Sequence, residues 1–338
     1  MIGYLLNLSY NNKFDFYIYK RIYSYLPKSL RPKLPKTVGI DPTTYCNLKC
    51  PPCMACKDTP GFEPCMLSLE NFKIMLDKMP FLEVLLLFNW GEPFLNPQFF
   101  DMIKYTKTKG LYALTYSNFS FKKDYEFFKN IIKSGLDDLL ISIDGTTQQN
   151  YEKFRKGGNL DLVFSNIKLF NKAKKELKCK RPRLYWHFTV DKFNEHEITQ
   201  AKKIAKELKI KLILNHLIIY SKVNETDLEE IKRKRKYWLP KKRKYILKLN
   251  DVGPKLNYRC PNLFSLVCFD AAGYAMPCRF LTDKNDAMGN LLENSFEEIW
   301  YGQKYLSSRS LFTKNKYSKK VETVCDKCTM YKKRTNIF

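Results

Sequence analysis

Short apolar runs alternate along the chain with longer segments in which apolar residues recur every three or four positions. The short runs are typical of strands buried in a parallel sheet, and the longer segments predict amphipathic helices. Ser68 is suited to cap the first of these helices, and Gly110 and Gly135 to end two others. The predicted strands lie at 36–43, 81–88, 111–117, 137–144, 183–190 and 209–216, and the predicted helices at 68–79, 97–110, 122–135, 161–177 and 195–208.

Six strands separated by helices indicate an α/β fold, a partial (βα)6 TIM-like barrel. In such barrels the functional residues lie at the carboxyl ends of the strands. The segments found there are CNLKCPPC (46–53) after the first strand, NWGEP (89–93) after the second, SNFS (117–120) after the third and SIDG (142–145) at the fourth. The sequence therefore predicts a functional site at this edge of the sheet.

The pattern changes near residue 259. CPNLFSLVCFDAAGYAMPC (260–278) predicts two short strands around a turn at Ala272 and Gly273, and GNLLENSFEEIW (289–300) contains a capped helix. This region is too short to fold on its own core, but a metal held by its cysteines would stabilise it. The predicted parts are an N-terminal extension (1–35), the barrel (36–216), a linker (217–258) and a small C-terminal domain (259–338).

The chain is strongly basic, with 60 Lys and Arg against 34 Asp and Glu and a net charge of +26. The lysines are spread over nearly every amphipathic segment, and the one dense run (232–248) is typical of a solvated surface. A nucleic acid is therefore disfavoured as a partner. The chain has no secretory signal and no apolar stretch of the roughly 18 residues that span a membrane, which predicts a cytoplasmic protein with reduced thiols.

Cys46, Cys50, Cys53 and Cys56 fall within eleven positions. Four thiolates can hold a structural zinc ion. Three of them can instead hold three irons of a [4Fe-4S] cluster and leave the fourth iron open to another ligand. The cysteine spacing alone does not decide between these sites.

The order of the motifs resembles that of the radical S-adenosylmethionine (SAM) enzymes, which have a C-x-x-x-C-x-x-C loop after the first strand and a GGEP-like segment after the second. The resemblance covers roughly residues 36–216 and implies that Cys46, Cys50 and Cys53 hold a SAM-binding [4Fe-4S] cluster. It also implies that SAM is bound by Gly91, Glu92, Pro93, Asn118, Ser142, Asp144 and Arg155.

In this resemblance, Gly91 to Pro93 contact the amino group of SAM and Arg155 pairs with its carboxylate. Ser142 and Asp144 approach the ribose or the carboxylate. Two positions depart from the family pattern, because Trp90 replaces the first Gly of GGEP and Pro52 stands where an aromatic residue often covers adenine. Three cysteines match no motif and are more often buried thiols than ligands: Cys56, Cys65 and Cys268.

The C-terminal spacing, C-x12-G-x4-C followed by C-x-x-C, fits a zinc ribbon. It also looks like the SPASM or shorter twitch extension of radical SAM enzymes. The resemblance implies that one auxiliary [4Fe-4S] cluster is held by Cys260, Cys278, Cys325 and Cys328. We expect a single auxiliary cluster because no cysteine follows Cys328 in this sequence.

The resemblance implies an enzyme that makes a 5′-deoxyadenosyl radical and removes a hydrogen atom from its substrate. A fully ligated auxiliary cluster would accept an electron, so we expect net oxidation, as in the similar aminocyclitol dehydrogenases, or the epimerisation of related sugar epimerases. The expected substrate is carbohydrate-like, and the expected reductant is a flavodoxin or ferredoxin. Modification of a ribosomally made peptide is the alternative, and a basic zinc-ribbon nucleic-acid-binding protein is the alternative from another class.

Overall fold

The structure is a computed structural model that describes residues 34–53, 63–217, 228–246, 260–279, 281–312 and 320–328. Cys56, nearly all of the predicted N-terminal extension and much of the predicted linker lie outside these ranges. Within them, no helix is both long enough and apolar enough to cross a membrane.

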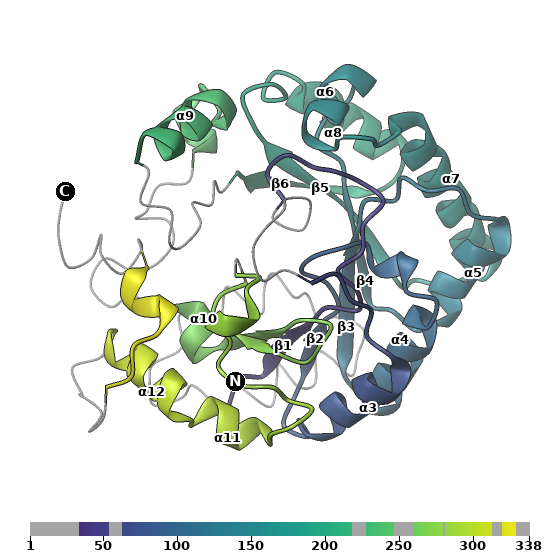
Figure 1. Cartoon of the computed structure of the whole chain (residues 1–338). Coiled ribbons are helices and arrows are strands. Elements are labelled where there is room, and N and C mark those ends of the chain that lie inside the picture. Colours follow the sequence, from purple (N-terminus) through teal and green to yellow (C-terminus); the bar gives the residue numbers. More distant parts are fainter. Residues whose placement is uncertain are drawn as a thin grey trace, which may run out of the picture.

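Eight strands form one curved sheet in the order β6-β5-β4-β3-β2-β1-β7-β8 (Figure 1). All neighbouring strands from β6 to β7 pair in parallel, and β8 is antiparallel to β7. The first six lie where the sequence predicts them, although the second is only three residues long. The strands are β1 (Thr37–Ile40), β2 (Val84–Leu86), β3 (Tyr112–Ser117), β4 (Asp138–Ser142), β5 (Arg183–Val190), β6 (Lys211–His216), β7 (Leu266–Phe269) and β8 (Ala275–Met276).

The crossover helices cover the convex face of the sheet, while α9 lies beyond β6 and α10 to α12 lie beside β1 (Figure 1). Ser68 caps the first described helix, as predicted, because its side chain accepts a hydrogen bond from the Asn71 N–H. The helices are α3 (Leu69–Asp77), α4 (Phe99–Thr108), α5 (Tyr125–Lys133), α6 (Gln148–Phe154), α7 (Leu160–Glu176), α8 (Ile198–Glu207), α9 (Leu228–Trp238), α10 (Pro261–Phe264), α11 (Phe296–Trp300) and α12 (Gln303–Ser310).

Both faces of strands β1 to β5 are largely buried, whereas the side chains of β6 at the edge of the sheet are exposed or half-exposed. Alternate side chains such as Leu85 and Ile141 join the core beneath the helices, and their neighbours Leu86 and Leu140 join a second cluster. This alternation follows from strand geometry, in which successive side chains point to opposite faces. It explains why the strands read as continuous apolar runs.

The C-terminal region continues the barrel sheet. Strand β7 pairs with β1, so that Val38 lies opposite Val267 and Ile40 opposite Phe269. Val267, Phe269 and Phe296 belong to the same core cluster as Val38. The sequence predicts a region without a core of its own, and in the structure its apolar side chains share the core of the barrel.

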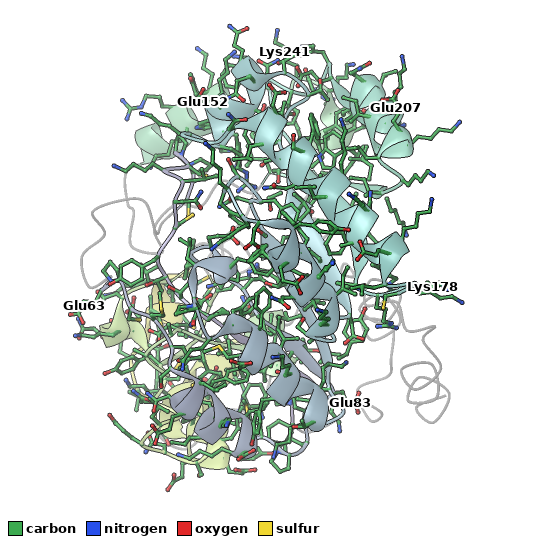
Figure 2. All side chains as sticks on the ribbon, turned by 90° about the vertical axis from the view of Figure 1, so that its right-hand side faces the viewer. Glu63, Glu83, Glu152, Lys178, Glu207 and Lys241 are labelled. Carbon is green, nitrogen blue, oxygen red and sulfur yellow. The ribbon has the colours of Figure 1, made fainter. Side chains whose placement is uncertain are left out.

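The dense basic run lies partly on α9. The described lysines and arginines of α9 are exposed or half-exposed, and Lys241 beyond it projects from the surface in Figure 2. This part of the run therefore has the solvated environment that the sequence predicts.

Lys78 joins the barrel to the C-terminal domain. It follows α3, and its Nζ donates hydrogen bonds to the backbone oxygens of Leu291 at 2.7 Å, Leu292 at 3.2 Å and Asn294 at 3.0 Å. Three carbonyl oxygens from one turn therefore depend on a single ammonium group.

We expect the substitution Lys78→Met to lower the free energy of unfolding by about 2 kcal/mol, because it removes charged hydrogen bonds but keeps most of the side-chain volume. Urea-induced unfolding followed by circular dichroism measures the change. Lys73→Met, at an exposed position on the same helix, is the matched control and should change the free energy by less than about 0.5 kcal/mol. Equal effects of the two substitutions would show that the hydrogen bonds of Lys78 contribute nothing.

Candidate functional site

The first cysteine loop is held at the carboxyl edge of the barrel. Cys50 is buried, and Cys46 and Cys53 are half-buried. The Cys53 N–H donates to the Cys50 carbonyl at 3.0 Å, and the Leu48 N–H donates to Cys46 Sγ at 3.4 Å. The side chain of Asn47 donates to the backbone oxygen of Ser120 at 2.7 Å, which ties the loop to the end of β3.

Asn118 connects this loop to the third strand. Its Nδ2 donates to Asn47 Oδ1 at 2.9 Å and lies 3.9 Å from Cys46 Sγ. Its backbone N–H donates to Glu92 Oε2 at 2.7 Å. One residue of the SNFS segment therefore contacts both the cysteine loop and the segment that follows β2.

Glu92 is 1% exposed and makes contacts with three loops. Its backbone N–H donates to the Tyr45 carbonyl at 2.7 Å. Its side chain accepts from Ser117 Oγ at 2.8 Å and from the Phe94 N–H at 3.3 Å, besides the Asn118 bond. Burial raises the pKa of Glu92 to about 7, although these hydrogen bonds oppose the shift.

Gly91 allows this close packing. Its φ is +68°, and a Cβ at this position would lie 2.3 Å from the Thr43 carbonyl oxygen. Only glycine fits there, because any side chain would meet the backbone of the cysteine loop. Pro93 begins the short 3-10 helix η3 (Pro93–Leu95) that follows. The structure thus brings the WGEP segment against the loop that carries Cys46.

Asp144 and Arg155 form an ion pair. Arg155 Nε lies 2.6 Å from Asp144 Oδ2, and the Thr189 N–H donates to Asp144 Oδ1 at 2.6 Å. Cys50 lies within electrostatic range of Arg155. The sequence assigns the two ionised side chains separate contacts with SAM, and the structure places them together beside the cysteine loop.

Ser142 is the last residue of β4, is 7% exposed and lies opposite His187 of β5. Burial lowers the pKa of His187 to about 4, so its imidazole is neutral near pH 7. The His187 ring packs edge-on against Tyr116, with their centroids 5.0 Å apart. These residues face the same carboxyl edge as the cysteine loop.

The four C-terminal cysteines come from three segments. Cys260 precedes α10, Cys278 follows β8, and Cys325 and Cys328 lie in and after the 3-10 helix η7 (Val324–Lys327). Burial first, and then Cys278 and Cys328, raise the pKa of Cys260. Cys325 interacts electrostatically with Cys260 and Cys328. The structure thus gathers the four predicted thiols in one region.

Cys65 and Cys268 are separate from both predicted ligand sets. Burial raises the pKa of each thiol to about 11, and the buried carboxyl group of Asp41 contributes to each shift. Asp41 follows β1 directly and accepts a hydrogen bond from the Trp90 N–H at 2.9 Å. Sequence reasoning missed Asp41, although an acidic residue directly after a buried strand is a signal that could have identified it.

No three His, Cys, Asp or Glu side chains among the described residues are placed to hold a single metal ion.

The chain matches the family model described as the radical SAM superfamily over residues 40–181. It also matches SPASM, described as an iron-sulfur cluster-binding domain, over residues 260–329. These ranges contain the two cysteine sets that the sequence singles out.

Among curated proteins, the chain is similar to the Fe-coproporphyrin III synthase of Methanosarcina barkeri (strain Fusaro / DSM 804). The two are 29% identical over 204 residues, which cover 60% of this chain and 48% of the relative. The chain spans about half the length of the curated relatives it matches.

Among solved structures, the chain is similar to Streptococcus suis SuiB bound to S-adenosylmethionine, with a TM-score of 0.63 and 17% identity over 98% of this chain and 80% of that one. A second SuiB structure contains the precursor peptide SuiA. BtrN in complex with AdoMet and 2-DOIA has a TM-score of 0.50 and 15% identity, over 83% of this chain and 88% of that one. At these identities the likeness shows the fold.

The matched models and the fold of these structures confirm the predicted partial barrel with a small C-terminal iron-sulfur domain. The barrel motifs that suggested the resemblance lie within the radical SAM match, and the C-terminal cysteines lie within the SPASM match that follows it. The chain therefore contains a radical SAM superfamily domain, followed by a SPASM iron-sulfur cluster-binding domain.

Proposed function

We propose that this enzyme oxidises or epimerises an alcohol carbon of a carbohydrate-like substrate. The observation that carries the radical chemistry of this proposal is the contact network that joins the cysteine loop, Glu92 and Asn118 at the carboxyl edge of the barrel. The substrate class rests on the resemblance to the aminocyclitol dehydrogenases and sugar epimerases. We assign Cys46, Cys50 and Cys53 to a SAM-binding [4Fe-4S] cluster.

The donor set fits such a cluster. Thiolates are the preferred protein ligands of iron-sulfur clusters, and the three cysteines are on one short loop fixed by backbone hydrogen bonds. Hydrogen-bond donors near the sulfur atoms tune such a cluster, and Asn118 Nδ2 and the Leu48 N–H lie near Cys46 Sγ. When bound, the reduced cluster and SAM supply a 5′-deoxyadenosyl radical that removes a hydrogen atom from the substrate.

The residues of this chain would orient SAM. Glu92 is an acceptor for its ammonium group, and the fixed position of Gly91 keeps backbone carbonyl oxygens close by. The guanidinium of Arg155 suits the carboxylate of SAM, with Asp144 fixing its orientation. Pro93, Asn118 and Ser142 complete the proposed binding residues.

We assign a second, auxiliary [4Fe-4S] cluster to the four C-terminal cysteines. Four thiols gathered from three segments suit a fully ligated group that accepts an electron rather than one that binds substrate. The matched ranges 40–181 and 260–329 lie within the barrel (36–216) and C-terminal domain (259–338) that we propose. The extension (1–35) and linker (217–258) complete this division.

The charge and the redox chemistry of the enzyme indicate its electron donor and its compartment. A net charge of +26 favours an acidic electron donor such as a flavodoxin or ferredoxin. Iron-sulfur ligands must be reduced thiols, which favours the reducing cytoplasm. Modification of a ribosomally made peptide is the alternative reaction, since SuiB has been solved with a precursor peptide.

We expect the combined substitutions Cys46→Ala, Cys50→Ala and Cys53→Ala to lower the iron content from about eight to about four per chain. Formation of 5′-deoxyadenosine should stop, because the barrel cluster has lost its ligands. Iron analysis and chromatography after anaerobic reconstitution measure both quantities. Cys179→Ala, at an exposed position, is the control. Persistent 5′-deoxyadenosine formation in the triple variant would refute the assignment.

The combined substitutions Cys325→Ala and Cys328→Ala should also remove about four irons per chain. Electron paramagnetic resonance of the reduced variant should still show the barrel cluster signal that shifts when SAM is added. Stoichiometric zinc in the wild type, with no loss of iron in the variant, would instead establish a zinc site in the C-terminal domain.

A further inference from the structure

A pocket with an apolar lining and a few carboxyl groups lies where the barrel meets the C-terminal domain. It opens beside the ends of β1 and β2 and the β7–β8 hairpin, and its lining includes Asp41, Cys65, Asn89, Trp90, Cys268 and Asp270. None of these residues belongs to the proposed cluster ligands. Trp90 directly precedes the Gly91–Glu92 segment of the proposed SAM site, so the pocket adjoins that site.

One carboxylate oxygen of Asp41 in this pocket accepts no hydrogen bond from the described residues. Asp41 is 1% exposed, and its Oδ1 accepts the Trp90 N–H. Its Oδ2 is buried and has no hydrogen-bond partner among the described residues. A buried acceptor without a partner is costly, and in a native protein it calls for a ligand or a water. Oδ1 is occupied by the hydrogen bond from the Trp90 N–H, so Oδ2 is the oxygen that can accept a hydrogen bond from a ligand.

The pocket is acidic although the protein is basic. Glu63 stands at the edge of the molecule in Figure 2 and pairs with Lys284, whose Nζ lies 2.8 Å from Glu63 Oε1. The charges of Glu63 and Lys284 compensate each other, so the remaining acidic groups of the lining are Asp41 and Asp270. Asp270 Oδ1 accepts the Ala272 and Tyr274 N–H groups of its own turn. Burial first, and then Asp270, raise the pKa of Asp41 well above its usual range, against the opposing effects of the Trp90 N–H group and Arg279. A donor or cation bound at Oδ2 would therefore stabilise the ionised carboxylate.

We propose that this pocket binds the substrate and that Asp41 Oδ2 accepts a hydrogen bond from one of its hydroxyl or ammonium groups. The substrate class is a small neutral or cationic polyol. Carboxylates accept such donors and repel anionic groups, and Trp90 and Phe269 supply apolar surface for the carbon faces of a ring. This inference rests on the proposed function, because it takes the radical to form beside this pocket.

The first test uses the half-buried Cys65 as a reporter in the reconstituted wild-type enzyme, whose ligand cysteines are occupied. Cationic aminoethyl methanethiosulfonate and anionic sulfonatoethyl methanethiosulfonate each form a mixed disulfide with a thiol and release methanesulfinate. Mass spectrometry of the Cys65 peptide gives the two rates. After the rate of each reagent is divided by its rate with 2-mercaptoethanol, we expect the cation to react at least several-fold faster. The net charge of +26 alone would favour the anion, and that result would overturn the inference.

The second test adds three probes of similar size: glucosamine, myo-inositol and glucuronate. We expect glucosamine and myo-inositol to slow the labelling of Cys65, and glucuronate to have no effect. Asp41→Asn keeps the Oδ1 acceptor and should weaken protection by glucosamine at least ten-fold, the loss expected for one charged hydrogen bond. Asp101→Asn, on the exposed face of α4, should protect as the wild type does.

Protection by glucuronate, the absence of protection by all three probes, or undiminished protection in Asp41→Asn would each overturn the inference. If Asp41→Asn does not retain iron, the two wild-type measurements still decide the question. Labelling and protection need no SAM cleavage, whereas 5′-deoxyadenosine formation needs no polyol. A failure of the pocket assignment is therefore distinguishable from a failure of the proposed function.

Discussion

Burial of the Glu92 carboxylate is the constraint on which the rest of the site depends. A carboxylate that is 1% exposed requires hydrogen-bond donors, and these come from the ends of β3 and η3, while its backbone N–H reaches the cysteine loop. Gly91 makes this approach possible, since a Cβ would lie within 2.3 Å of the Thr43 carbonyl oxygen. Three loops are thereby fixed around Glu92, and one of them is the loop that carries the cysteines.

Strand β1 gives the molecule its second constraint, because it pairs with β2 on one side and with β7 on the other. Its carboxyl end leads into Asp41 and then into the cysteine loop. The C-terminal domain therefore cannot move away from the barrel without breaking a parallel strand pair and the contacts of Lys78. A pocket between the two parts is as fixed as the sheet itself, which suits the positioning of a substrate.

The sequence predicts most of the barrel because strands β1 to β5 are largely buried on both faces and the helices have apolar faces, which are local signals. It misses α6, whose seven residues are stabilised by a distant group: Glu197 accepts hydrogen bonds from Thr147 Oγ1 and Asn150 Nδ2, both at 2.9 Å. The cysteines and Glu92 are predictable from motif order. The pairing of Asp144 with Arg155 and the pairing of β7 with β1 are not, because each joins residues that no local pattern connects.

The unpaired Oδ2 of Asp41 cannot be predicted from the sequence either. Its burial depends on the pairing of β1 with β2 and β7, which joins residues far apart in the chain. Its setting also separates two electrostatic roles. The lysines spread over the surface give the whole molecule a positive field that attracts acidic proteins, whereas the pocket is lined by the carboxyl groups of Asp41 and Asp270 beside the self-compensating Glu63–Lys284 pair. Charges within a buried pocket are screened less than those on the surface. Net charge would therefore govern the encounter with an electron donor, and the local carboxylates would govern the choice of substrate.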